Sequence, residues 1–178
     1  MQWFELSRNQ IEDQLVKVFA TNSILSSAMS YASLNGGKRM RPLLCVAAGM
    51  VSDANADDLH KVGAAVELIH CYSLVHDDLP VMDNDDLRRG LPTCHIKYGD
   101  AIAILAGDAL QSMAFELISQ PMNMLPVKQL QIINILANAS GVYGMAGGQA
   151  LDILSTNQIL ELDALKKMHS LKTGALIK

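Results

Sequence analysis

Apolar residues recur along the chain at the spacing of amphipathic helices. Residues 10–19 carry apolar side chains three or four positions apart, and similar patterns follow downstream. No stretch alternates convincingly between apolar and polar residues, which is the pattern of a strand. The chain is therefore predicted to be all-α. The expected helices cover residues 10–19, 23–34, 42–50, 57–77, 100–118 and 126–139, with a last one beginning near 163.

The ends of these helices carry recognisable signals. Ser23 is suited to cap the second helix, and Gly36-Gly37 to end it. Pro42 fits the first turn of the next helix, because the nitrogen of a first-turn residue has no helical partner to lose. Pro80 breaks the long apolar pattern that ends at Asp77, and Asp163 is expected to cap the last helix.

The long helix over residues 57–77 bears a polar stripe. Glu67, His70, Ser73 and Asp77 follow one another at intervals of three or four residues, so they share one face. A stripe that faces solvent is the commoner case. Because this stripe ends in a cluster of carboxylates, we expect it to line a wet cavity inside the bundle.

That cluster holds five carboxylates within ten residues, at Asp77, Asp78, Asp83, Asp85 and Asp86. Carboxylates at the C-terminal end of a helix oppose its macrodipole, so stability alone would not select them. A hard cation such as Mg²⁺, shared between a few carboxylates and substrate phosphates, would reverse the balance. The alternative is a solvated acidic loop. An EF-hand is excluded, because its sixth position needs Gly and a loop counted from Asp83 has Arg88 there.

Basic residues accompany the acidic cluster at three places. Arg88 and Arg89 follow it directly and suit phosphate oxygens. Lys38 and Arg41 lie at the start of a predicted helix, where an anion would be stabilised, although a basic turn in solvent fits equally well. The segment 36–41 is not a P-loop, and 172–174 (Lys-Thr-Gly) lacks the Ser-x-x-Lys of β-lactamases. Lys172 is interpreted either as a phosphate contact or as an ordinary exposed lysine.

Composition narrows the class of protein. The chain has 178 residues, half of them apolar, which suggests one domain with a substantial core. A net charge of −4 gives no electrostatic case for nucleic acid. Three cysteines without metal-ligand spacing indicate reduced thiols and a cytoplasmic protein. The first residues do not form a signal peptide, and the apolar segment 43–51 is far shorter than a membrane span. We therefore expect no membrane span.

Taken in order, these segments resemble the trans-prenyl diphosphate synthases, most closely the bacterial farnesyl diphosphate synthases. The matching segments span almost the whole chain, and the specific one is Asp-Asp-x-x-x-x-Asp at Asp77, Asp78 and Asp83, followed by Arg-Arg-Gly. The resemblance implies a helical bundle of the isoprenoid synthase type around a central cavity, in a homodimer. It implies condensation of isopentenyl diphosphate with dimethylallyl or geranyl diphosphate to give farnesyl diphosphate. The matching segments are 36–42, 67–92, 147–152 and 172–174.

The resemblance also implies roles for individual residues. Asp77 and Asp83 would bind Mg²⁺, and Arg88 would contact the allylic diphosphate. Tyr72 and Ser73 would form the floor that limits the length of the product. The residues implied to bind isopentenyl diphosphate are Lys38, Arg41, His70 and Arg89, and Lys172 and Thr173 would reach the allylic diphosphate. The residues implied to be catalytic are Asp77, Asp78, Asp83, Arg88 and Lys172.

The chain departs from the family in a minor way at Asn84, where relatives often have Asp, and seriously at its C-terminal end. It ends at Lys178, four residues beyond Gly174, and so without the family's second aspartate-rich motif. We expect residues 1–178 to be the N-terminal part of a single prenyl-synthase domain whose C-terminal helices are missing, and to be inactive alone. One alternative is a non-catalytic fragment or regulatory paralogue. Another is a terpene cyclase, which is disfavoured because two basic pairs suit two diphosphates.

Overall fold

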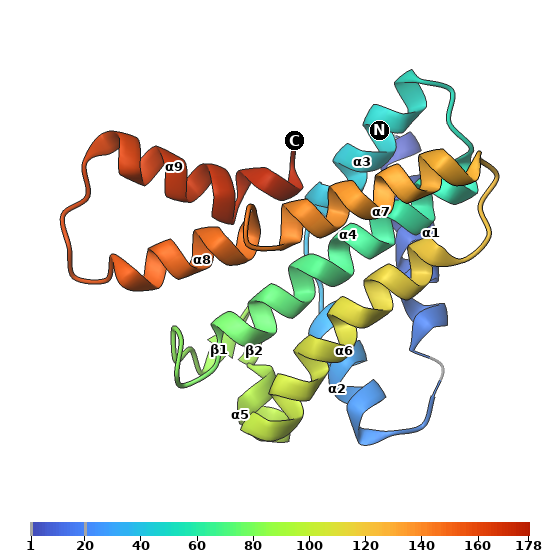
Figure 1. Cartoon of the computed structure of the whole chain (residues 1–178). Coiled ribbons are helices and arrows are strands. Elements are labelled where there is room, and N and C mark those ends of the chain that lie inside the picture. Colours follow the sequence, from blue (N-terminus) through green and yellow to red (C-terminus); the bar gives the residue numbers. More distant parts are fainter. Residues whose placement is uncertain (1, 20) are drawn as a thin grey trace. The chain divides into compact units, whose positions relative to one another are not determined.

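Helices account for most of the chain, and the prediction of an all-α fold is confirmed (Figure 1). The computed structural model describes residues 2–19 and 21–178. The other regular elements of the described residues are an antiparallel hairpin, with two residues in each strand, and one 3₁₀ turn. The elements are α1 Gln2–Val18, α2 Ile24–Leu34, α3 Met40–Val51, α4 Ala56–Asp77, β1 Leu87–Arg88, β2 Leu91–Pro92, α5 Cys94–Tyr98, α6 Asp100–Ser119, α7 Pro126–Ser140, α8 Met145–Leu154, α9 Leu162–Lys172 and η1 Gly174–Leu176.

The chain forms two compact units, Met1–Asn123 and Met124–Lys178. The first contains α1 to α6 and the hairpin, and the second contains α7 to α9 and η1. The expectation of one prenyl-synthase domain over residues 1–178 stays a prediction.

Helix α4 is the centre of the first unit. It packs along α6 and also contacts α3, α1 and α2. Its buried face is built from small and aliphatic residues, including Ala64, Ala65, Leu68 and Val75. Small side chains let neighbouring helices approach on several sides, so α4 is enclosed over much of its length. Of the polar stripe on α4, Glu67 is consequently buried and His70, Ser73 and Asp77 are half-buried, whereas Asp57 at the start of the helix is exposed.

Helix α6 is the one described helix with the length and composition of a membrane span. Core helices of compact proteins share both properties. In this structure α6 packs against α4 and α2, and its residues Ala103, Ala106, Leu110 and Ala114 are fully buried. These contacts make α6 a core helix of the first unit.

Several predicted helix ends are confirmed. Ser23 caps α2 by accepting a hydrogen bond from the Ser26 amide at 3.0 Å, and Pro126 opens α7. A cap that the sequence reasoning did not name begins α4, where Asn55 accepts from the amides of Asp57 and Asp58 at 3.0 and 3.2 Å. The long α4 therefore begins at a fixed point and ends at the acidic cluster.

Two predicted boundaries are wrong. Helix α1 begins at Gln2 rather than near residue 10. Ser7 lies one turn before Ile11 and Phe4 lies two turns before it, so the buried face of the helix continues toward the N-terminus. Helix α9 begins at Leu162, with Glu161 rather than Asp163 at the N-cap position. Asp163 instead lies in the first turn, where its charge suits the helix dipole.

In the second unit, α8 and α9 pack closely. Gly148 makes this approach possible, since a Cβ there would lie 2.1 Å from the backbone nitrogen of Lys172. The glycine-rich start of α8 thus fixes where α9 passes, and with it the backbone position of Lys172.

Candidate functional site

The chain turns back on itself directly after α4. The amide of Asp83 donates to the carbonyl of Asp77 at 2.8 Å, and the amide of Asp85 donates to the carbonyl of Asp78 at 3.2 Å. The amide of Asn84 reaches Leu79 in the same way at 3.1 Å. The sequence predicted that Pro80 would break the helical pattern that ends at Asp77. The backbone confirms this prediction.

The carboxylates of this turn are open to solvent to different degrees. Asp77 is half-buried and Asp83 is exposed. Among the described residues, no three His, Cys, Asp or Glu side chains are grouped so that they could hold a metal ion by themselves. Mg²⁺ in substrate sites commonly takes only one or two carboxylates together with phosphate oxygens. The pair Asp77 and Asp83 fits that donor set, and their metal-binding role stays a prediction.

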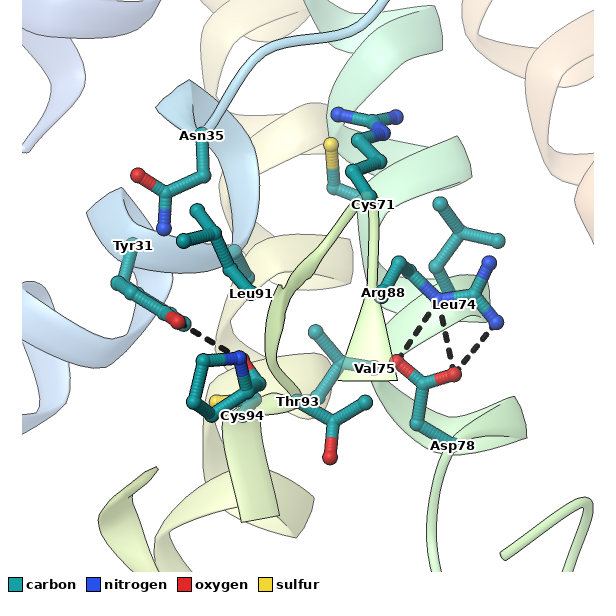
Figure 2. Close-up of a pocket in the computed structure, with 13 residues that line it drawn as sticks. Tyr31, Asn35, Cys71, Leu74, Val75, Asp78, Arg88, Leu91, Thr93 and Cys94 are labelled. Carbon is teal, nitrogen blue, oxygen red and sulfur yellow. Dashed lines mark hydrogen bonds and ion pairs between the residues drawn. The ribbon is translucent and has the colours of Figure 1, made fainter. Parts of the chain in front are cut away.

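Asp78 differs from both. Its side chain is only 3% exposed, and the Nε of Arg88 donates to both of its carboxylate oxygens at 2.8 Å (Figure 2). This hydrogen bond is the main cause that raises the pKa of Arg88, and the charge of Asp78 adds to it. Asp78 therefore anchors Arg88 in this structure, and its oxygens point into the protein instead of toward the other carboxylates.

A tight hairpin presents Arg88 and Arg89. Leu87 pairs with Pro92 and Arg88 with Leu91, so Arg89 and Gly90 form a two-residue turn. Their φ angles are +56° and +80°, as a type I′ turn requires at both central positions. The hydroxyl of Tyr31 on α2 donates to the Pro92 carbonyl at 2.7 Å and ties the hairpin down (Figure 2).

A small cavity of about 40 Å³ lies between α2, α4 and this hairpin (Figure 2). Two thiols line it. Burial raises the pKa of Cys71 to about 12 and that of Cys94 to about 11. Both remain protonated at neutral pH and cannot serve as thiolate nucleophiles. This agrees with a chemistry that needs no covalent enzyme intermediate.

A larger, basic cavity of about 150 Å³ opens beside Arg89. It brings together all four residues for which the resemblance implied binding of isopentenyl diphosphate. Three carry a positive charge, at Lys38, Arg41 and Arg89, and the fourth is His70 from α4. The structure thus assembles the predicted set from three separate segments. The remaining residues that line the cavity are Arg39, Met40 and Glu67.

Arg89 is held at the edge of the cavity by the loop after α2. Its Nη1 donates to the carbonyl of Gly36, and its guanidinium lies against Gly37. A Cβ at Gly37 would lie 2.8 Å from that nitrogen, and Gly37 has a φ of +122°. Glycine is needed there for both reasons. Gly36 and Gly37 therefore hold the side chain of Arg89 in position.

His70 is neutral in this cavity. Burial, together with the charges of Arg41, Arg89, Arg88 and Arg39, lowers its pKa to about 3. A neutral imidazole can still donate one hydrogen bond to a phosphate oxygen, without adding to the crowding of positive charge.

Sequence reasoning gave no role to Arg39, which is the most thoroughly buried charge in the first unit. Its side chain has no exposed surface. Its Nε donates to Glu12 at 2.6 Å, its Nη1 to Glu67 at 2.8 Å and its Nη2 to the carbonyl of Ser33 at 2.7 Å. The signal that points to such a partner is Glu67 itself, because a carboxylate on an apolar helix needs a counter-charge.

The proposed product floor lies one turn before the acidic cluster. Tyr72 is half-buried, and its ring meets that of His76 edge to face at 5.8 Å between centroids. Ser73 donates to the carbonyl of His70 at 2.8 Å, on its own helix. His76 in turn fits against Gly107 of α6 and bonds the Ile104 carbonyl at 3.0 Å. These contacts fix the ring of Tyr72, and its role stays a prediction.

Lys172 and Thr173 lie in the second unit, at the end of α9. The Nζ of Lys172 pairs with the carboxylate of Asp152 on α8 at 2.6 Å. The sequence analysis did not predict this ion pair. The contact of Lys172 and Thr173 with an allylic diphosphate stays a prediction.

Comparison with known proteins shows the family. Residues 22–178 match the polyprenyl synthetase family, and the chain belongs to it. It is 49% identical over 167 residues to a farnesyl diphosphate synthase of Haemophilus influenzae, covering 94% of this chain and 57% of that protein. It is 52% identical over 160 residues to the farnesyl diphosphate synthase of Escherichia coli, covering 88% of this chain and 53% of that protein.

Solved structures agree. The crystal structure of a geranyltransferase from Legionella pneumophila superposes with a TM-score of 0.92 at 40% identity, over 98% of this chain and 64% of that one. A farnesyl and geranylfarnesyl diphosphate synthase from Zymomonas mobilis gives 0.87 at 42%, over 97% and 67%. The isoprenoid synthase fold is thus confirmed. The chain spans little more than half the length of the curated relatives it matches.

Proposed function

We propose that this protein is a prenyltransferase that condenses isopentenyl diphosphate with dimethylallyl or geranyl diphosphate to give farnesyl diphosphate. Relatives at 49% and 52% identity bear the name of that activity. The observation that carries the proposal is the cavity in which Lys38, Arg41 and Arg89 converge beside His70. Its neighbour along the hairpin, Arg88, is anchored at the acidic turn. Two anion sites next to each other suit a reaction between two diphosphates.

Isopentenyl diphosphate would occupy the basic cavity. Three cationic side chains offset the charge of its diphosphate, and the neutral His70 adds one hydrogen bond. Charge-assisted hydrogen bonds of this kind fix orientation as well as affinity. The double bond of the substrate is then held at a set distance from the anchored end.

The allylic diphosphate would bind at the acidic turn. Asp77 and Asp83 are the residues suited to hold Mg²⁺, which when bound would offset the charge of the diphosphate that leaves. Arg88 would add a guanidinium from the hairpin, with Asp78 behind it to keep it in place. Lys172 and Thr173 are proposed to contact the same diphosphate.

The chemistry replaces an allylic carbon–oxygen bond by a carbon–carbon bond and releases pyrophosphate and a proton. The allylic carbon–oxygen bond breaks and its electron pair leaves with pyrophosphate, which the cationic side chains stabilise. The double bond of isopentenyl diphosphate then supplies the electrons for the new carbon–carbon bond. Loss of a proton from the former isopentenyl unit restores a double bond. An apolar enclosure is needed throughout, because water would quench the allylic cation.

The length of the product is proposed to depend on Tyr72, whose bulky ring would stop growth at fifteen carbons. Tyr72→Ala is expected to shift the products toward longer chains, because it removes a ring that His76 and burial hold in place. The measurement is chromatography of the dephosphorylated products. Ser112→Ala on the exposed face of α6 is the control. An unchanged distribution in Tyr72→Ala would remove Tyr72 from this role.

A cytoplasmic location and a homodimer are part of the same proposal and stay predictions. The comparisons give no support to the alternative of a non-catalytic regulatory paralogue, since the matched relatives are named as synthases.

The proposal is tested with the complete gene product, Mg²⁺, geranyl diphosphate and labelled isopentenyl diphosphate. Farnesyl diphosphate is the expected product. Lys38→Ala should raise KM for isopentenyl diphosphate by about tenfold or more and leave KM for geranyl diphosphate nearly unchanged, since one charge-assisted contact is lost on one side only. Lys17→Ala, an exposed lysine at the end of α1, is the matched control. Equal effects on both substrates would contradict the assignment of the cavity.

A further inference from the structure

Arg39 stands between two predicted phosphate ligands along the chain but is turned inward. Each of its three guanidinium nitrogens donates within the protein, to Glu12, Glu67 and the carbonyl of Ser33. The side chain has no exposed surface, and the backbone takes the left-handed conformation with φ of +50°. Such a conformation is costly for an arginine and is kept only where contacts fix it. Arg39 is therefore not available as a phosphate ligand.

The partner that matters for the cavity is Glu67. It belongs to α4, its side chain is only 3% exposed, and it lines the same cavity as Lys38, Arg41, His70 and Arg89. A carboxylate in the wall of a site for a diphosphate is unfavourable. Two like charges at contact distance repel each other strongly at the effective dielectric of a protein surface. The cavity can hold a diphosphate only if a positive charge within the protein offsets the negative charge of Glu67.

We propose that Arg39 neutralises Glu67 and thereby makes the basic cavity able to hold a diphosphate. This inference rests on the proposed function, because it assumes that the cavity binds isopentenyl diphosphate. Arg39 is then a positioning residue that acts through Glu67. It holds the carboxylate at 2.8 Å and cancels its charge, while Lys38 and Arg41 on either side of it face the ligand.

Glu12 provides an internal contrast. It pairs with the same arginine at 2.6 Å, but it lies on α1, is 30% exposed and is not among the residues that line the cavity. If Arg39 served only to tie helices together, loss of either carboxylate would have a similar effect. If it serves to mask Glu67, the two carboxylates differ, because only one of them faces the ligand.

The test is a double-mutant cycle with inorganic pyrophosphate as the probe, titrated calorimetrically into the purified protein and its variants. Arg39→Gln should weaken binding by about tenfold or more, because it leaves Glu67 uncompensated. Arg39→Gln combined with Glu67→Gln should restore the affinity to within about threefold of wild type, although Arg39 is still absent. Glu12→Gln should change it by less than about twofold. A double variant as weak as Arg39→Gln would overturn the proposal.

Glu67→Gln alone keeps the test decisive if Arg39→Gln does not fold. The glutamine oxygen can still accept from Arg39, so the fold is retained while one negative charge leaves the cavity wall. Pyrophosphate should then bind as tightly as to wild type or more tightly, and weaker binding would overturn the masking role. Lys38→Ala separates the two proposals. If Lys38→Ala binds pyrophosphate as tightly as wild type does, the assignment of the cavity is wrong. If Lys38→Ala binds more weakly than wild type but Arg39→Gln binds as tightly as wild type, the cavity assignment holds and the proposed role of Arg39 is wrong.

Discussion

The basic cavity and the acidic turn lie at the two sides of one hairpin, yet they are built differently. Two of the charged groups that shape the cavity are held by partners in the protein: Arg39 donates to Glu67, and Arg89 donates to the Gly36 carbonyl. The backbone of the turn is fixed by hydrogen bonds and Asp78 holds Arg88, whereas Asp83, Asp85 and Asp86 extend into solvent. The cavity therefore has two of its charged groups held in place before a ligand arrives, whereas three of the five carboxylates of the turn are exposed.

The difference follows from charge. Lys38, Arg41 and Arg89 repel one another around a cavity of about 150 Å³, and the neutral His70 adds no further positive charge there. The carboxylates of the turn also repel one another, but water screens exposed charges and makes the cost small. A preorganised site lowers the stability of the fold and in return has a higher affinity for its ligand. The acidic turn instead needs its ligand to bring the carboxylates together.

The largest effect is expected at the acidic turn. Asp77→Asn should lower kcat by about a hundredfold or more, because an interaction with the departing charge is lost. The assay is the condensation reaction of the complete gene product. Asp85→Asn is the control, since its carboxylate lies at 3.7 Å from Arg88 and is 53% exposed. Similar losses in both variants would show that the turn acts by total charge and not through particular residues.

The buried carboxylate should behave unlike its exposed neighbours. Asp78→Asn should lower the free energy of unfolding by about 2 to 3 kcal/mol, because a paired, 3% exposed charge is removed and Arg88 loses its anchor. Asp85→Asn should cost less than about 0.5 kcal/mol. Urea unfolding measures both. Equal values would mean that the ion pair of Asp78 contributes no more than a surface contact.

Two adjacent glycines can sharpen the description of the cavity. Gly37→Ala should destabilise the protein by about 2 kcal/mol and weaken pyrophosphate binding, because its methyl group would meet Arg89 at a φ that alanine avoids. Gly36→Ala has open space at its Cβ and a φ of +81°, so it should cost only about 1 kcal/mol. Calorimetry and urea unfolding give both quantities. If the variants are alike, the contact with Arg89 is unimportant.

The smallest effect concerns pH. The pKa of His70 is about 3 in the folded protein and near 6.5 when unfolded, so the folded state loses stability as pH falls below 6.5 toward 3. His70→Asn should reduce this loss by about 1 to 2 kcal/mol between pH 7 and 5. Unfolding curves across that range are the measurement, with His169→Asn, exposed on α9, as control. Parallel curves for wild type and His70→Asn would contradict a neutral, buried imidazole.

Much of the architecture follows from local signals in the sequence. The caps at Ser23 and Asn55 and the break at Pro80 depend on residues a few positions apart, so periodicity and capping chemistry mark most helices. The set that lines the basic cavity was reached through the family resemblance, and the structure brings its four members together.

The features that sequence reasoning missed depend on distant or weak signals. Arg39 and Glu67 are 28 residues apart, and nothing local shows that one serves the other. The hairpin has strands of two residues, too short for an alternating pattern to appear. Helix α5 has five residues and is stabilised by contacts with α6 rather than by its own sequence.

The hairpin has a consequence for how this segment can vary in length. Its two-residue turn, the bond from Arg88 back to Asp78 and the backbone bonds from Asp83 and Asp85 to Asp77 and Asp78 together set the number of residues between the end of α4 and Arg89. An inserted or deleted residue would change the face on which an arginine emerges and separate it from its anchor. Insertions and deletions should therefore be absent from residues 77–92 in functional variants, even though this is a surface loop.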